Sequence, residues 1–297
     1  MKYVITGGAG NISKPLTLAL IKVGHDVSVI GRNAANLKEL TDAGANAALG
    51  SVDDVNFLTQ AFAGADAVYT MVPPRYDITS KWIGVMEQIG KNYAAAVKAN
   101  NIKYVVNLSS IGGHMPEGCG PVSGLNKVEN ALNSLTDVNI KHLRPAYFYG
   151  NLLGNVGMVK HMNIIGNNFG GPNFKFAIVD TNDIAEAAIE ELSKLNFTGH
   201  SVRYIASDEV TTDEVAKTLG AAIGKPELPW VTFSSEQAFG GMIQAGFTEE
   251  VAKNFAEMGD AIASGKMYED YWTNRPASLG KTKLADFAKT FAFVYNQ

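Results

Sequence analysis

The chain has 297 residues, of which 46% are hydrophobic and 18% are charged. This balance can fill a folded core and excludes an intrinsically disordered chain. The formal net charge of −4 argues against direct nucleic-acid binding through a basic face. A single cysteine, Cys119, excludes an internal disulfide framework and a cysteine-based zinc site. No apolar run approaches the roughly 20 residues of a membrane span, and a strand starts almost at Met1, so we expect no membrane segment, no signal peptide and a cytoplasmic location.

Short apolar runs that read as strands alternate with stretches that read as helices as far as Pro145. The expected strands cover residues 3–5, 27–30, 45–49, 67–72, 104–108 and 140–143. The expected helices cover residues 16–23, 34–43, 53–62, 79–99 and 124–135. Such alternation with short connections predicts an α/β fold, with a Rossmann-type, doubly wound parallel sheet covered by helices on both faces.

Beyond Pro145 the regular alternation ends. Residues 151–171 are rich in glycine and asparagine, so we expect long loops here that close over the ligand cleft as a lid. A strand at 175–179, a helix capped by Asp183 and a strand at 202–205 are expected next. From Thr211 onward the pattern is mostly helical, with a last helix near 282–293. The second half, residues 151–297, is therefore expected to complete the sheet and add a smaller, mainly helical substrate lobe.

A glycine turn joins the first strand to the first helix, at Gly7-Gly8-Ala9-Gly10. Glycine is needed there because the backbone turns tightly and a pyrophosphate must approach it closely. The helix that starts near Ile12 directs its free N–H groups and its positive end at that phosphate. Ser13, another small residue, replaces the third glycine of the usual pattern. This turn predicts a dinucleotide site in the first half of the chain.

The second strand ends at Gly31-Arg32-Asn33, and Arg32 lies 22 residues after Gly10. Folds that bind NAD normally carry an acidic residue near this position, which binds the ribose hydroxyls. A guanidinium group instead stacks on adenine and binds the 2′-phosphate of NADP. We therefore expect a preference for NADP(H) over NAD(H).

Several short motifs, in their order and spacing, resemble the NmrA-like family of atypical short-chain dehydrogenases/reductases. The resemblance runs from Met1 to about Ala206 and more loosely to the C-terminus. The motifs are Thr6–Gly10, Gly31–Asn33, Gly50–Asp54, Ala63–Val68, Val72–Pro74, Leu108–Ser110, and Leu143–Pro145 followed by Phe148 and Asn151.

This resemblance implies an NADP-binding Rossmann domain, here residues 1–150, and a cleft between it and the C-terminal lobe. The pyrophosphate would be held by the turn of Thr6, Gly7, Gly8, Ala9, Gly10, Asn11, Ile12 and Ser13, and the 2′-phosphate by Arg32 beside Asn33. The adenosine side would be lined by Ser51, Val52, Met71, Val72 and Pro73. Ser51 stands where many relatives carry an acid that contacts adenine. The nicotinamide side would be lined by Ser109, Ser110, Pro145, Tyr147 and Phe148, with Lys127 as either a ribose clamp or a surface lysine.

The chain lacks the Tyr-x-x-x-Lys relay of many short-chain dehydrogenases, in which the tyrosine moves the proton and the lysine lowers its pKa. No tyrosine is followed four residues later by lysine, and Tyr271 with Arg275 is the nearest match. Where the motif belongs, one register supplies Ser123 and Lys127, and the other supplies Pro121 and Leu125. The absence argues against alcohol oxidation and against sugar-nucleotide epimerisation by the tyrosine mechanism.

Two functions remain open. In the first, the protein transfers hydride from NADPH to a small quinone-like or aromatic acceptor that needs little proton help. His114 or Tyr147 is then the expected proton donor, with Tyr149 as a further candidate. In the second, the protein senses NADP(H) without turnover and acts through a protein partner. No metal is expected, because His142 and His161 have no suitably spaced carboxylate or cysteine.

Overall fold

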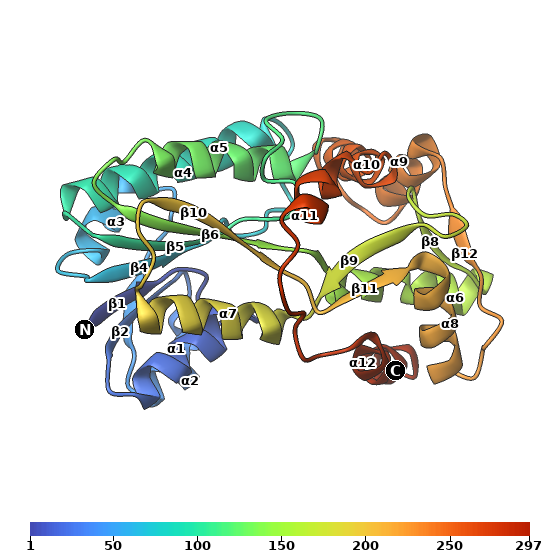
Figure 1. The fold of residues 1–297 in the computed structure, drawn as a ribbon, viewed down its shortest axis with the longest axis horizontal. Helices are drawn as coiled ribbons and strands as arrows, with labels where there is room; N and C mark the ends of the chain where they lie inside the picture. Colours follow the sequence, from blue (N-terminus) through green and yellow to red (C-terminus); the bar gives the residue numbers. More distant parts are fainter.

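The computed structural model describes residues 1–297 and has a seven-stranded parallel sheet at its centre (Figure 1). The strand order is β10-β6-β5-β4-β1-β2-β3. The chain winds from β1 to β3 in one direction and from β4 to β10 in the other, so the expected doubly wound Rossmann sheet is confirmed. The strands are β1 (Lys2–Ile5), β2 (Asp26–Gly31), β3 (Asn46–Leu49), β4 (Ala67–Thr70), β5 (Tyr104–Leu108), β6 (Asn139–Pro145) and β10 (His200–Ile205).

Helices cover both faces of this sheet (Figure 1). One face carries α1 (Ser13–Lys22), α2 (Ala34–Asp42) and α7 (Thr181–Lys194), and the other carries α3 (Val55–Ala61), α4 (Trp82–Ala99) and α5 (Pro121–Asn133). Local sequence fixes several of their starts, because Asn33, Asp54 and Asp180 each accept a hydrogen bond from a backbone N–H in the first turn of the next helix. No helix combines the length and apolar character needed to cross a membrane.

A chain of buried polar side chains crosses the middle of the sheet. The Thr70 hydroxyl donates to Asn107 Oδ1 at 2.9 Å, and Asn107 Nδ2 lies 3.1 Å from His142 Nδ1. On its other side, His142 Nε2 lies 3.0 Å from Asn133 Oδ1 on α5. Thr70, Asn107 and His142 are direct partners in the register of β4, β5 and β6. The ladder satisfies every group when His142 is neutral and carries its proton on Nε2, so we assign that tautomer.

Apart from α7 and β10, the chain from Tyr147 onward extends the molecule beyond one end of the sheet (Figure 1). It contains a three-stranded sheet of order β11-β9-β7 and a two-stranded sheet of β12 and β8. The strands are β7 (Tyr147–Phe148), β8 (Ile165–Asn167), β9 (Lys175–Val179), β11 (Asp208–Thr211) and β12 (Trp230–Thr232). The helices are α6 (Val156–Met162), α8 (Thr212–Ala222), α9 (Ser235–Gln244), α10 (Glu249–Ala263), α11 (Glu269–Thr273) and α12 (Leu284–Tyr295), with 3-10 turns η1 (Tyr149–Asn155) and η2 (Lys266–Tyr268).

The expectation of long loops at residues 151–171 was wrong, because η1, α6 and β8 occupy most of this stretch. Its glycines and asparagines have packing roles. A Cβ at Gly166 would lie 2.0 Å from the Val231 carbonyl oxygen, so only glycine lets β8 and β12 come this close. Asn155 Oδ1 accepts a hydrogen bond from the Gly166 N–H at 3.1 Å. Local composition cannot distinguish such tertiary demands from loop flexibility.

The cap expected at Asp183 was also wrong. Asp180 caps α7, and Asp183 is buried one turn inside it. The Asp183 carboxylate accepts hydrogen bonds from the Ser207 hydroxyl and from the backbone N–H groups of Lys281 and Thr282. It therefore ties the segment before α12 to the sheet. Two helix starts also differ: α4 begins at Trp82 instead of Thr79, and α5 at Pro121 instead of Gly124, since proline suits the first helical position.

Candidate functional site

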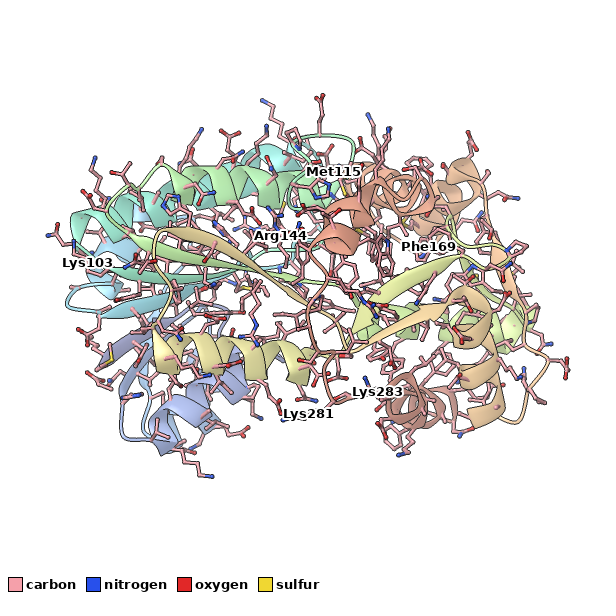
Figure 2. All side chains as sticks on the ribbon, in the orientation of Figure 1. Lys103, Met115, Arg144, Phe169, Lys281 and Lys283 are labelled. Carbon is pink, nitrogen blue, oxygen red and sulfur yellow. The ribbon has the colours of Figure 1, made fainter.

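The site predicted from the sequence lies along the carboxyl edge of the large sheet, which faces the C-terminal half of the chain. Figure 2 shows Arg144, near the carboxyl end of β6, at the middle of the molecule, whereas Lys103, just before β5, lies at the far end of the sheet. Hydrogen bonds tie the edge loops together. The Met71 N–H donates to Thr6 Oγ1 at 2.9 Å, and the Ser109 N–H donates to the Leu143 carbonyl at 2.8 Å. The loops that follow β1 and β4 are thus joined to each other, and the loop that follows β5 is joined to the end of β6. All of them lie at the carboxyl edge near the point where the winding reverses, which is where doubly wound sheets bind ligands.

The turn between β1 and α1 has the geometry that its glycines predict. Gly7 and Gly8 have φ angles of +93° and +58°, in the left-handed region that favours glycine. The Gly8 N–H donates to the Ile30 carbonyl at 2.9 Å, and this bond ties the turn to β2. Buried Ser13 donates through Oγ to the Thr6 carbonyl at 2.8 Å and closes the turn from the helix side. A Cβ at Gly7 would lie 2.5 Å from Ser13 Oγ, so a side chain at position 7 would displace the Ser13 hydroxyl from this bond.

The start of α1 is open to a ligand. No side chain caps this helix, and no acidic residue stands in its first turn. Ala9, Gly10 and Asn11 are exposed, whereas Ile12 is buried beneath them. Uncapped N–H groups and the positive end of the helix dipole together form an anion site. The residues present therefore fit a dinucleotide pyrophosphate.

The residues expected around the adenosine lie next to the turn. Arg32 is exposed and has no ion-pair partner, whereas Asn33 uses its side chain to cap α2. Val52 is buried, and Ser51 donates through Oγ to the Asp53 carboxylate at 2.8 Å. Met71, Val72 and Pro73 follow β4 and are partly buried. The edge thus presents a free guanidinium group beside an apolar wall.

Arg75 is a charged residue at this edge that sequence reasoning missed. Its Nη2 lies 2.5 Å from Asp53 Oδ2. Partial burial alone would raise the pKa of Asp53, but hydrogen bonds from Arg75 and Ser51 and the charges of Arg75 and Arg32 lower it overall. Arg75 and Asp53 are 22 residues apart in the chain, and no local motif joins them.

On the nicotinamide side, Tyr147 is buried in an aromatic cluster. Its ring contacts Phe169 and Phe176 edge-on, with centroid distances of 5.5 and 5.9 Å. Burial raises the pKa of the Tyr147 hydroxyl to about 12, although a long contact with Asn167 opposes the shift. The hydroxyl is therefore protonated at neutral pH. Pro145 is buried and Phe148 is half-buried beside this cluster, and Figure 2 shows Phe169 in the C-terminal half of the molecule.

The loop after β5 carries two buried polar atoms without a hydrogen-bond partner, Ser109 Oγ and His114 Nδ1. Such orphaned atoms are rare in folded proteins and indicate a missing partner, such as a ligand or a water molecule. Ser110 is partly buried in the same loop. Between them, a Cβ at Gly113 would lie 2.7 Å from Glu129 Oε1 and 3.0 Å from Ser109 Oγ. Glycine at position 113 therefore lets the loop lie directly on a buried ion pair.

That ion pair joins Glu129 on α5 to Arg144 on β6. Arg144 donates from Nε and Nη2 to the two carboxylate oxygens at 3.0 and 2.6 Å. Its Nη1 donates to the Tyr204 hydroxyl at 3.0 Å and to Asp270 on α11 at 3.1 Å. Tyr204 also donates to Asp270. Sequence reasoning used Arg144 only as part of a motif and missed this four-residue cluster, which fastens α11 over the sheet.

With this geometry in hand, comparison with known proteins identifies the relationship. The model of the NmrA-like family matches residues 2–288. The chain belongs to this family. It is 24% identical to a protein named NAD(P)H azoreductase from Xenophilus azovorans, over 98% of both chains.

Solved structures with the same fold include two reductases. An NADPH-dependent quinone oxidoreductase from Escherichia coli, complexed with NADPH, superimposes with a TM-score of 0.81 at 19% identity, covering 97% of this chain and 99% of the other. The triphenylmethane reductase of Citrobacter sp., complexed with NADP(H), gives a TM-score of 0.80 at 21% identity, with the same coverage. At these identities the structural likeness establishes the fold.

This NmrA-like chain carries no tyrosine on α5, and the face of α5 that meets the site presents Asn126. Asn126 Nδ2 donates to the Gly113 carbonyl at 2.8 Å, and thereby holds the loop that carries His114. Lys127 lies on a different face. It lines a groove of about 530 Å³ between α4 and α5, together with Glu87 and Lys91. Lys127 thus lines the outer groove between α4 and α5, and its role as a ribose clamp stays a prediction.

Two other features, Cys119 and a cavity beside α7, offer no free reactive group. Cys119 is buried, and burial raises the pKa of its thiol to about 12, so it stays protonated at neutral pH. A cavity of about 660 Å³ lies between α7, β10 and residues 274–281, away from the glycine turn. Its charged side chains are already paired, with Arg203 bound to Glu190 and Lys281 bound to Glu186.

Proposed function

We propose that this protein binds NADP(H) and catalyses hydride transfer from NADPH to a quinone-like or aromatic acceptor, without a Tyr-x-x-x-Lys relay. The observation that carries the proposal is the uncapped start of α1 behind the glycine turn, next to the unpaired Arg32. Pyrophosphate and 2′-phosphate are the two anions that such a pair of sites recognises. The near full-length relatedness to an NAD(P)H azoreductase supports the same reading.

In this proposal the turn from Thr6 to Ser13 binds the pyrophosphate, and Arg32 selects NADP(H). Ser109 and His114, whose polar atoms lack partners, meet the nicotinamide side. We place the cofactor on residues 1–150 and the acceptor on residues 151–297, beside Phe169 where its ring meets that of Tyr147. When bound, NADPH supplies a hydride from its nicotinamide ring.

The proton requirement depends on the acceptor. A quinone that receives hydride becomes a hydroquinone anion and takes one proton to complete the reaction. A cationic triphenylmethane dye becomes neutral on receiving hydride and takes no proton. We assign proton donation to His114, with Tyr147 as the alternative. Neither side chain makes a strong hydrogen bond within the protein that would compete with a ligand.

The test is oxidation of NADPH, compared with NADH, against quinones, azo dyes and triphenylmethane dyes, together with dinucleotide binding by calorimetry. We expect binding and turnover, both better with NADPH. Binding without turnover would contradict the catalytic half of the proposal and favour a sensor that acts through a protein partner. Absence of dinucleotide binding would contradict the whole proposal.

The proton donor is tested with His114→Phe. Loss of a general acid slows a proton-coupled step by about a hundredfold or more, so quinone reduction is expected to fall by at least that factor. Reduction of a cationic triphenylmethane dye, which needs no proton, is expected to change less than threefold. Equal losses with both acceptors would show that His114 positions a ligand instead of donating a proton, and Tyr147→Phe would then be the next variant.

A further inference from the structure

The carboxyl edge of the sheet carries a second guanidinium group besides Arg32. Arg75 follows β4 and bonds to Asp53 through one of its five N–H donors. It makes no other hydrogen bond, so four donors remain. The side chains of Arg75 and Asp53 are 27% and 47% exposed, so a soluble ligand can reach both.

Arg32 and Arg75 follow different strands, and both lie near the carboxylate of Asp53, but of the two only Arg75 bonds to it. Arg32 follows β2, Arg75 follows β4, and the charges of both act on Asp53. The Gly50 N–H donates to the Gly31 carbonyl at 3.1 Å, so the segment that carries Asp53 lies beside the one that carries Arg32. An anion near Asp53 would therefore lie close to both arginines.

We propose that Arg75 is a second ligand of the 2′-phosphate of NADP(H) and acts together with Arg32. The inference rests on the proposed function and adds a residue that determines its cofactor specificity. A phosphate monoester offers three acceptor oxygens and up to two negative charges, which two guanidinium forks match better than one. In the free protein, Asp53 holds Arg75 at the edge and is the anion that the phosphate replaces.

The backbone around Arg75 is anchored on the C-terminal half of the chain. Tyr76 packs against Phe247 with a centroid distance of 6.0 Å, edge to face. The Thr248 hydroxyl donates to the Ile78 carbonyl at 2.5 Å, and the Trp82 N–H donates to Glu250 Oε1 at 2.8 Å. These contacts fix the loop before the ligand arrives, and a pre-organised ligand loses less conformational entropy on binding. Arg75 is thus presented from a fixed backbone, although it lies in a loop.

The experiment compares Arg75→Met, Arg32→Met and the control Lys98→Met, which removes the same charge from the last turn of α4. Dissociation constants are measured for NADPH and NADH, and for 2′,5′-ADP and 5′-AMP as probes that differ chiefly in the 2′-phosphate. Loss of one charge-assisted hydrogen-bonding partner weakens binding by about tenfold. We expect about tenfold weaker binding of NADPH and 2′,5′-ADP in each arginine variant. NADH and 5′-AMP are expected to stay within twofold, and Lys98→Met is expected to match the wild type.

An unchanged NADPH to NADH affinity ratio in Arg75→Met, with a reduced ratio in Arg32→Met, would overturn the inference and leave the proposed function intact. Equal weakening of NADPH and NADH in Arg75→Met would also overturn it, because Arg75 would then support the loop or the adenosine. A wild-type protein that binds neither dinucleotide would instead remove the proposed function. Arg75→Lys keeps the charge without the fork and is expected to retain part of the preference, which separates phosphate binding from misfolding.

Discussion

At the carboxyl edge of the sheet, Arg144 differs from Arg32 and Arg75 in what surrounds its guanidinium group. Arg144 is buried beneath α11, and its guanidinium group meets Glu129, Tyr204 and Asp270. Arg32 and Arg75 are accessible, and between them they have one bonded carboxylate, that of Asp53. A buried cation must be satisfied within the fold, because an unpaired charge there is strongly destabilising. An exposed cation keeps unused N–H donors that a ligand can accept from. The buried arginine therefore stabilises the fold, and the accessible arginines are the ones that can bind a ligand.

The largest effect is expected when the buried cluster loses Glu129. Its side chain is 5% exposed and that of Arg144 is 9% exposed, so Glu129→Gln leaves a buried guanidinium group with an incomplete set of acceptors. Removing one partner of a buried ion pair lowers the free energy of unfolding by about 3 kcal/mol. Urea denaturation monitored by circular dichroism measures this change.

The matched control is Glu87→Gln on α4, which breaks the exposed pair with Lys91 and is expected to cost less than about 0.5 kcal/mol. Glu129→Gln is expected to keep the wild-type NADPH to NADH affinity ratio. A changed ratio, or equal stability losses in the two variants, would contradict the division between structural and ligand-binding arginines.

A second, pH-dependent effect is expected from buried His142, which lies on β6 two residues before Arg144. Burial lowers the pKa of His142 to about 4, although the charge of Glu129 opposes the shift. In the unfolded chain the imidazole titrates near pH 6.5. The unfolded state therefore binds more protons between these values, and stability falls as the pH drops from about 6.5 to about 4. Between pH 7 and pH 4.5 the loss amounts to about 2 kcal/mol.

Urea denaturation at several pH values measures this loss. His142→Asn is expected to flatten the dependence over this range, whatever its effect on stability at pH 7. His161→Gln, which changes an exposed histidine, is expected to leave the dependence as in the wild type. An unaltered slope in His142→Asn would show that other groups govern acid destabilisation.

The same division explains what the sequence could predict. The glycine turn, Arg32 and the alternation of strands and helices are local patterns, and the structure has them where the sequence predicts them. The Arg75–Asp53 pair and the Arg144 cluster join residues that are 15 to 126 positions apart, and no periodicity reports such contacts. The prediction of long loops at residues 151–171 was wrong for a related reason. Gly166 is required because β12 comes close to it, and not because the backbone forms a loop there.

The smallest difference between a variant and its control is expected at the glycine turn itself. Gly7→Ala places a residue with a side chain at φ +93°, with its Cβ 2.5 Å from Ser13 Oγ and 3.1 Å from Met71 Cγ. Gly24→Ala introduces a comparable φ, +87°, with no heavy atom within 4 Å of the new Cβ. In both variants the backbone strain lowers the free energy of unfolding by about 1 kcal/mol. In Gly7→Ala the close contact lowers it by about 1 kcal/mol more. Urea denaturation of the two variants measures that excess.

Dinucleotide binding then separates the two glycines further. Gly7→Ala is expected to weaken NADPH and NADH by the same factor, about tenfold, since both share the pyrophosphate that the turn holds. Gly24→Ala is expected to leave both affinities unchanged. A selective loss of affinity for NADPH in Gly7→Ala would mean that the turn also orients the arginines. The turn would then belong to the 2′-phosphate site as well as to the pyrophosphate site.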